Sequence, residues 1–262
     1  MSIGRFIWHD LITTDVEAAK RFYGELLGWT TIDWSGPEDA PNPEPYPMIQ
    51  AKGAERAQGG MMANQTPGIP PHWVANVITD DADALAARAT AAGGGILFGP
   101  FDIPGVGRNV LVRDPQGAAL AFIAFLGEGM APPEGLQPAG SFVWDELMTN
   151  DTAGAAAFYG KVIGWGTQTW DNPEVDYTLF TAGETQAAGM MPLAEGMPPV
   201  PYWLPYVNVD SAEATAARVQ ELGGSVLAGP FEVPTIGWIL IIGDPQGAAL
   251  GMIQPDLSGM GA

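Results

Sequence analysis

The sequence predicts an α+β fold in which one domain is written twice along the chain of 262 residues. The segment FIWHDLITTDVEAAKRFYGELLGW, from Phe6 to Trp29, is echoed by FVWDELMTNDTAGAAAFYGKVIGW, from Phe142 to Trp165. A second echo, DPQGAAL, begins at Asp114 and again at Asp244, an offset of 130 residues (244 − 114). A period of this length is too long for a solenoid and matches a duplicated domain.

The duplication sets the domain boundaries. We predict a first domain over residues 1–126, a linker rich in glycine and proline over residues 127–139, and a second domain over residues 140–262. The offset is 136 in the first echo (142 − 6) and 130 in the second, so the first copy holds six extra residues (136 − 130). We place most of them in the proline-rich stretch 37–47.

Each copy contains two βαβββ modules. The first module opens with a strand-like segment, residues 5–11, in which aromatic and β-branched residues dominate. The helix that follows has apolar residues at spacings of three and four, a capping box of Thr14 and Glu17 at its start, and Gly28 at its end. Three strand-like segments complete the module, at residues 30–34, 46–52 and 58–63.

The remaining modules follow the same order. In the second module a strand leads to a helix that Asp80 opens and Gly93–Gly94 closes, and the DPQG sequence has the residue preferences of a type I turn. The predicted strands lie at 72–78, near Ile96, at 109–113 and at 118–125. In the second copy they lie at 142–147, 167–170, 177–182, 187–191 and 203–209, near Val226, and at 238–242 and 248–254, with helices over 151–163 and from the capping box Asp210–Glu213 to Gly223.

Composition excludes several classes of partner. Thirty acidic residues against ten basic ones give a net charge of −20, which argues against nucleic acid and anionic membrane surfaces. The longest apolar run, Ala118 to Leu126, is far too short to cross a bilayer. The chain has no cysteine, and its first residues show no signal-peptide pattern, so we expect a cytoplasmic protein.

The repeated motifs resemble those of the vicinal oxygen chelate superfamily, which includes glyoxalase I, extradiol dioxygenases and bleomycin-resistance proteins. These motifs are FYxxxxGW after the first helix of each copy, GPF at 99–101 and 229–231, and DPxG before the last strand. The resemblance covers nearly the whole chain. It implies that the two modules of each domain curve into a half-open barrel with a concave cavity, in which the family's enzymes hold a divalent metal on His and Glu.

The resemblance also bears on partners. It implies a small-molecule ligand, and it implies that two fused domains take the place of the dimer that single-domain relatives form. We therefore expect a monomer with pseudo-dimeric domains, with a homodimer as the alternative.

The family's metal-ligand positions carry no metal-binding side chains in this sequence. Counting from the motifs puts Trp8, Val74 and Ala121 at three positions of the first copy, and Trp144, Leu204 and Gly251 at the same positions of the second. The remaining position lies near Met61–Met62 or Met190–Met191, and neither 57–65 nor 187–194 contains a His, Asp or Glu. We expect no metal cofactor at this site, with a divalent metal at a displaced site as the alternative.

Alternation along the strands predicts which residues face each cavity. If Trp8 faces the concave side, Phe6 and Asp10 face it too, because they lie two residues away on the same strand. By the same alternation His72, Val74 and Asn76 face the concave side from the strand that starts at His72. The predicted ligand-binding residues are Trp8, Asp10, His72, Asn76, Trp144, Glu146, Tyr202 and Tyr206. Two matched positions hold different residues in the two copies: His72 corresponds to Tyr202, and Arg108 corresponds to Trp238. These differences predict that the two cavities differ chemically.

The roles of these residues stay open between two readings. Trp8 and Trp144 either fill the barrel or stack on a ligand. Asp10 and Glu146 either act as a general base or are hydrogen-bonded at the rim, and His72 either pairs with Asp10 or lies exposed. His9, of opposite parity, is expected to face the helix layer as a structural residue. Trp73 and Trp203 should pack under the helices, the methionine pairs should fill the core, and Asp114 and Asp244 should belong to turns.

Two functions follow. The first is a metal-independent protein that binds an apolar or aromatic small molecule in the cavity. The second is an enzyme, lyase, isomerase or dioxygenase-like, in which Asp10 with His72 or Glu146 with Tyr202 moves a proton, or in which a displaced metal acts. The candidate catalytic residues are Asp10, His72 and Glu146. A third reading makes one copy a structural partner that has lost its site.

Overall fold

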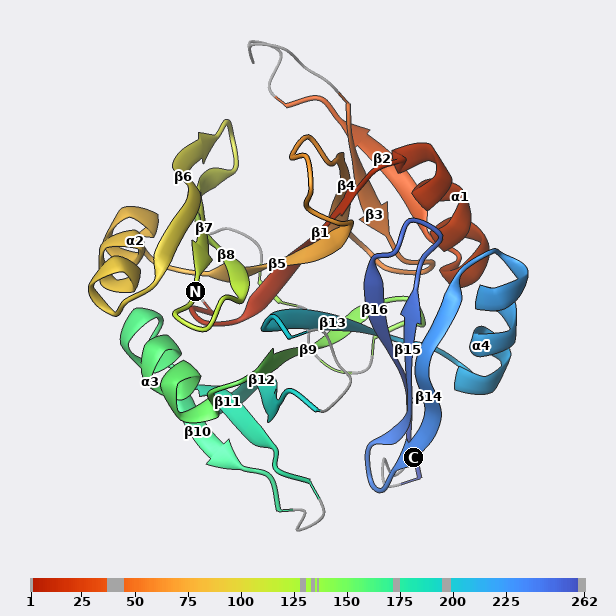
Figure 1. The fold of residues 1–262 in the computed structure, drawn as a ribbon. Coiled ribbons are helices and arrows are strands. Elements are labelled where there is room, and N and C mark those ends of the chain that lie inside the picture. Colours follow the sequence, from red (N-terminus) through yellow and green to blue (C-terminus); the bar gives the residue numbers. More distant parts are fainter. Residues whose placement is uncertain are drawn as a thin grey trace.

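The computed structural model describes residues 2–36, 45–127, 131–132, 135, 137–171, 175–194 and 199–258. These residues form two eight-stranded mixed sheets and four helices, arranged as two tandem domains (Figure 1). Most of the predicted proline-rich stretch, residues 37–44, and part of the predicted linker lie outside the described residues.

The sheet of the first domain joins two βαβββ modules side by side. Its strand order is β2-β3-β4-β1-β5-β8-β7-β6, with β1 and β5 antiparallel at the centre. The sheet curves without closing, as expected for a half-open barrel (Figure 1). The elements are β1 (Phe6–Thr13), α1 (Val16–Leu27), β2 (Thr30–Trp34), β3 (Tyr46–Gln50), β4 (Gly59–Ala63), β5 (His72–Ile78), α2 (Ala82–Ala91), β6 (Gly95–Ile103), β7 (Gly107–Arg113) and β8 (Ala119–Phe125).

The second domain repeats this arrangement in the order β10-β11-β12-β9-β13-β16-β15-β14. Its elements are β9 (Phe142–Thr149), α3 (Thr152–Val162), β10 (Gly166–Thr169), β11 (Thr178–Ala182), β12 (Thr185–Pro192), β13 (Tyr202–Asn208), α4 (Ala212–Glu221), β14 (Ser225–Val233), β15 (Gly237–Gly243) and β16 (Ala249–Pro255). The α+β class and the four βαβββ modules predicted from the sequence are confirmed.

Three helices begin one residue later than predicted. The N-caps are Asp15 in α1, Asp81 in α2 and Ser211 in α4, and each side chain accepts a hydrogen bond from the third backbone amide beyond it. In each case two possible capping residues are adjacent, and the second is the one whose oxygen reaches that amide. Gly28 ends α1 in the left-handed conformation, with φ of 68°, as predicted.

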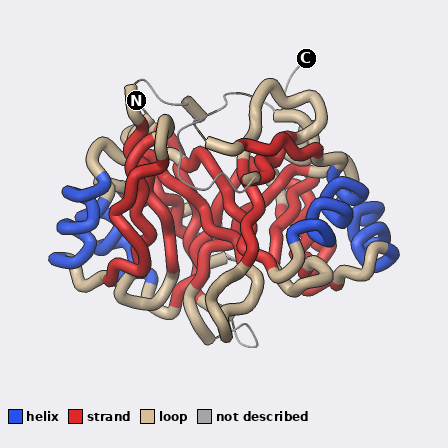
Figure 2. Tube along the Cα trace, turned by 90° about the horizontal axis from the view of Figure 1, so that it is seen from above, coloured by secondary structure: helices blue, strands red, loops and turns tan. Residues whose placement is uncertain are grey.

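The helices lie on the flanks of the molecule and the strands lie between them (Figure 2). Helix α1 packs beside α4, and α2 packs beside α3, so each contact joins the two domains (Figure 1). Each of the two large hydrophobic cores is likewise built mainly from one module of each domain, with Trp203 or Trp73 added from a further module. None of the described helices combines the length and apolar character needed to cross a bilayer.

The repeated motifs meet at the seam, the contact between the convex sides of the two domains. Tyr23 donates from its hydroxyl to Asp244 Oδ2 at 3.1 Å, and Tyr159 donates to Asp114 Oδ2 at 3.0 Å. The other oxygen of each aspartate accepts three backbone amides of its own turn. Asp114 and Asp244 therefore belong to turns, as predicted, and also bind the tyrosine of the opposite domain.

Two tryptophans of the motifs fasten the same seam. Trp29 donates from Nε1 to the Gly140 carbonyl at 2.6 Å, and Trp165 donates to the Gly4 carbonyl at 2.8 Å. Tyr23 corresponds to Tyr159 and Trp29 to Trp165 in the duplication. The two halves are thus related by an approximate two-fold axis, and each contact occurs twice.

Candidate functional site

The concave face of the first domain is organised around the carboxylate of Asp10 on β1. Its Oδ1 accepts from the Trp8 indole at 3.1 Å and from the Tyr46 hydroxyl, and its Oδ2 accepts from the Asn76 side-chain amide at 3.0 Å. Asn109 on β7 donates to Asn76 Oδ1 at 2.8 Å and extends the network. Burial raises the pKa of Asp10, although the hydrogen bonds from Tyr46, Asn76 and Trp8 act in the opposite direction.

Tyr46 is the member of this network that the sequence did not identify. Its hydroxyl donates to Asp10 and accepts from Trp8 Nε1 at 2.8 Å. The tyrosine ring lies against Gly60 on β4, where a Cβ atom would be only 2.0 Å from Tyr46 Cζ. One signal was available, since Tyr46 and Tyr177 stand at matching places where the second strand of the hairpin begins in each copy.

The second concave face has a different set of partners around Glu146 on β9. Glu146 Oε2 accepts from the Tyr206 hydroxyl at 2.8 Å, and the carboxylate also accepts from Tyr177. Trp144 donates to the Tyr177 hydroxyl at 2.9 Å, as Trp8 does to Tyr46. Burial raises the pKa of Glu146, and burial followed by the charge of Glu146 raises the pKa of Tyr206.

The structure does not form the two predicted acid–base couples. His72 is partly buried, and its Nδ1 lies 2.8 Å from the Pro70 carbonyl, while the hydrogen bonds found for Asp10 in the described residues come from Trp8, Tyr46 and Asn76. Burial raises the pKa of Tyr202, and the nearby charge of Glu146 raises it further. The hydrogen bonds that Glu146 accepts in the described residues come from Tyr177 and Tyr206 instead. His72 is thus hydrogen-bonded to the backbone and partly buried, rather than paired with Asp10 or fully exposed.

The predicted concave position of Phe6 is wrong. The register of β1 on β5 shifts between Phe6 and Trp8, which is the signature of a β-bulge. The extra residue reverses the alternation, so Phe6 packs in the seam against Trp165 and Trp203, with ring centroids 5.8 and 5.5 Å apart. Ile7 is buried beside Trp8 in its place.

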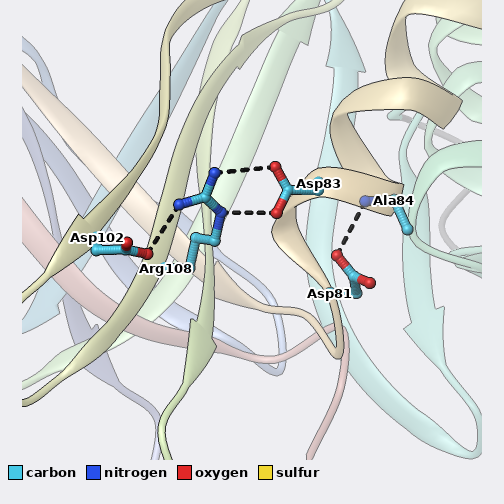
Figure 3. Close-up of polar contacts among 5 residues, drawn as sticks. All are labelled: Asp81, Asp83, Ala84, Asp102 and Arg108. Atoms are coloured by element: carbon cyan, nitrogen blue, oxygen red, sulfur yellow. Dashed lines mark hydrogen bonds and ion pairs between the residues drawn. The ribbon is translucent and has the colours of Figure 1, made fainter.

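Arg108 also lies outside the cavity, contrary to the predicted contrast between Arg108 and Trp238. Its guanidinium donates to both oxygens of Asp83 on α2, at 2.6 and 3.0 Å, and to Asp102 on β6 at 2.8 Å (Figure 3). Asp81 caps α2 beside this cluster by accepting from the Ala84 amide (Figure 3). The side chain thus faces the helix, because Asn109, the next residue, takes the concave side.

His9 lies in the seam and contacts the residue that occupies its own place in the second copy. Its Nε2 lies 2.9 and 3.1 Å from the two carboxylate oxygens of Asp145 (145 − 9 = 136). Both side chains are buried. Burial raises the pKa of Asp145, and the nearby His9 partly offsets this shift. The structural role predicted for His9 agrees with this position, but its partner was not foreseen.

The strand register locates the fourth metal-ligand position, which counting left open. Asp10 pairs with Gly60 just as Asn76 pairs with Ala121, so Gly60 is the counterpart of Ala121 in the first module. In the second domain Glu146 pairs with Gly189 and Tyr206 with Gly251. At these strand positions Gly60, Ala121, Gly189 and Gly251 have no side-chain atom that could bind a metal. No group of three or more His, Cys, Asp or Glu residues suited to a metal occurs in the described part of the chain. The side chains at the four family positions therefore do not fit a divalent metal.

The comparisons with known proteins agree with this fold. The chain is 34% identical over 260 residues to "Putative glyoxylase CFP32" of Mycobacterium tuberculosis, covering 95% of this chain and 94% of the relative. It is 31% identical over 259 residues to "Anthracycline biosynthesis protein DnrV" of Streptomyces peucetius, covering 94% and 92%.

Two solved structures share the fold at low sequence identity. The Mn(II)-bound glyoxalase of Novosphingobium aromaticivorans has a TM-score of 0.65 at 16% identity, covering 96% of this chain and 82% of the other. The 2,3-dioxygenase LapB of Pseudomonas sp. KL28 has a TM-score of 0.62 at 14% identity, covering 96% and 92%. A family model matches residues 3–122 and 141–252. The chain therefore belongs to the Glyoxalase/Bleomycin resistance protein/Dioxygenase superfamily.

Proposed function

We propose that this protein binds an aromatic small molecule on a concave sheet face without the help of a metal. One observation carries the proposal: the four family ligand positions of the first domain hold Trp8, Gly60, Val74 and Ala121, which offer surface to a ligand but no donor to a metal. An apolar and aromatic site with a few buried polar groups is the usual form of a small-molecule site.

The names of two relatives suggest a chemical class for the ligand. Two relatives are named for anthracycline biosynthesis, and anthracyclines contain fused, planar, oxygenated aromatic rings. Trp8 and Tyr46 present aromatic rings to such a molecule, with centroids 6.5 Å apart, and Trp34 meets Tyr46 edge to face. The Asp10 network supplies polar groups for hydroxyl or carbonyl oxygens at one end of the ligand.

The test combines metal analysis with a defined probe. We expect purified protein to hold no stoichiometric metal and to bind 1,8-dihydroxyanthraquinone equally well before and after treatment with a chelator. Substitution Trp8→Ala should weaken binding by roughly tenfold or more, the loss of one stacking contact. Trp238→Ala is the matched control, since Trp238 is exposed and its neighbour Ile239, not Trp238, has the concave parity. Stoichiometric Mn(II) whose removal abolishes binding would overturn the proposal.

A second candidate function is favoured by the raised pKa of Asp10 beside the Tyr46 hydroxyl. A carboxyl group with a raised pKa can hold a proton and deliver it to a bound ligand. Asp10→Asn keeps the shape of the side chain and removes this proton. If the protein converts its ligand, the variant should bind but not turn over. Turnover of a methylglyoxal–thiol hemithioacetal that survives Asp10→Asn and Glu146→Gln would exclude both carboxylates as the proton donor.

We also propose that the chain is a monomer. Its own two domains already pack against each other through the helix pairs α1–α4 and α2–α3 and share both large hydrophobic cores. Small-angle scattering should give the mass of one chain, 27.5 kDa. A mass of two chains would show that a further face associates.

A further inference from the structure

We infer that only the first concave face receives the ligand and that the side chain of Tyr206 fills the second face from within. The inference rests on the proposed function, because it specifies which of the two faces performs it. It begins from positions that the strand registers align: Trp8, Asn76 and Ala121 in the first domain match Trp144, Tyr206 and Gly251 in the second.

Tyr206 has a larger side chain than Asn76, the residue at the matched position of the first domain. It is 4% exposed, and its hydroxyl reaches across the face to Glu146 at 2.8 Å. Its ring lies directly on Gly251, where a Cβ atom would be 2.3 Å from Tyr206 Cδ1. The Tyr206 ring therefore leaves room only for a glycine at position 251. We call this pair, Tyr206 and Gly251, the filler of the second face. In the first face the matched residues are the shorter Asn76 and Ala121, which are themselves buried, each 4% exposed.

Three residues on the same face as Tyr206 are buried. Met148 and Leu204 are each 1% exposed and Glu146 is 7% exposed, so all three are buried. Their counterparts in the first face are Ile12, Val74 and Asp10, and each of these is only partly buried. Every one of these matched positions is thus more accessible in the first domain than in the second.

The first face also exposes apolar surface at both edges of its sheet. Phe98 on β6 is 62% exposed and Ile32 on β2 is 48% exposed. The registers align Phe98 with Leu111 and Ala121, and Ile32 with Met48 and Gly60, so both residues have the concave parity. Their counterparts in the second domain are Ala228 and Gln168, which offer little apolar surface, and the exposed apolar residue of concave parity on β14 is Phe231, at 45%. Exposed aromatic and aliphatic side chains around a polar centre suit a planar aromatic ligand.

A reciprocal exchange tests the inference with isothermal titration calorimetry, using 1,8-dihydroxyanthraquinone as the probe. The natural chain should bind one molecule. Asn76→Tyr with Ala121→Gly builds the filler into the first face and should abolish binding, with at least about a hundredfold loss in affinity. Tyr206→Asn with Gly251→Ala removes the filler from the second face and should raise the stoichiometry to two.

Near-ultraviolet circular dichroism and thermal unfolding identify any variant that fails to fold, and the Trp8→Ala and Trp144→Ala variants of the natural chain give a second measurement. Trp8→Ala should weaken binding and Trp144→Ala should not. Two equivalent sites in the natural chain, or loss of binding in Trp144→Ala alone, would overturn this inference and leave the proposed function standing. Absence of binding to any folded form would contradict both.

Discussion

The seam and the two concave faces lie on opposite sides of the same strands, but they differ in how far the two copies have diverged. In the seam the copies remain matched, since Tyr23 and Tyr159 make the same hydrogen bond to Asp244 and Asp114. On the concave side the matched positions hold different side chains, as Asn76 and Tyr206 illustrate. The two copies thus agree at these contacts between the halves and differ on the concave side.

The seam departs from this symmetry at its centre. His9 and Asp145 are matched in the duplication and contact each other, which places them on the approximate two-fold axis. A base and an acid at this point form one asymmetric pair. The following predictions test how strongly each part of the comparison holds, starting with this pair.

The largest effect is expected for His9→Leu. The substitution leaves the Asp145 carboxyl group buried in the seam without its imidazole partner, and stranding one member of a buried pair in this way costs about 3–5 kcal/mol. Urea unfolding measures the loss. The double variant His9→Leu with Asp145→Leu should recover most of it, because no unpaired polar group then stays buried. Equal losses in the single and double variants would show that packing, and not charge, sets the cost.

The second effect tests the symmetry of the seam directly. Tyr23→Phe and Tyr159→Phe each remove one hydrogen bond to a turn aspartate, with an expected cost of about 1.5–3 kcal/mol for a bond to a charged group. The two losses should be nearly equal, because the two sites are built alike. Thermal or urea unfolding of both variants in one buffer makes the comparison, and a clearly unequal pair would argue against a matched seam.

The third effect separates the two concave faces. Gly251→Ala places a Cβ atom against the Tyr206 ring, and overpacking of this kind costs about 1–3 kcal/mol. The reverse change at the matched position, Ala121→Gly, meets no such ring and should cost less. Adding Tyr206→Asn to Gly251→Ala should restore stability, which thermal unfolding can report. If it does not, the ring is not the obstacle.

The smallest effect concerns pH. Burial raises the pKa of Glu146, so the folded state binds this proton more tightly than the unfolded chain does. Its contribution to stability is therefore greatest at low pH and is lost as the pH rises above the ordinary glutamate pKa of about 4.3. In Glu146→Gln, unfolding temperatures measured across this range should fall less steeply with pH than in the natural chain.

Asp83 provides the control of opposite sign. Hydrogen bonds from Arg108 lower the pKa of this exposed carboxyl, so its contribution is present at neutral pH and disappears as the pH falls. Asp83→Asn should reduce stability slightly at neutral pH and have no effect in acid. A Glu146→Gln variant that behaves like Asp83→Asn would contradict the burial of Glu146.

Much of this arrangement could be predicted from the sequence, because the duplication aligns two independent copies of each element. The strand parity of Trp8 and Asp10 and the buried positions of Trp73 and Trp203 followed from local patterns. The bulge that reverses Phe6 did not, since an inserted residue has no signature in an apolar strand. Tyr46 was missed for another reason: it reaches Asp10 from a strand whose register depends on a loop, and loop lengths do not fix register. Partners across the seam depend on how two domains dock, which no pattern within one copy records.

The His9–Asp145 contact also has a consequence for the history of the chain. In a dimer of two identical subunits, a residue on the two-fold axis meets a copy of itself, so the same place would bring two imidazoles or two carboxylates together. A chain of two fused halves can carry a different residue at each of these positions and so place complementary groups there. Two identical copies of either half would bury like groups against each other at the same place. The fusion is therefore held in place by chemistry as well as by the peptide linker.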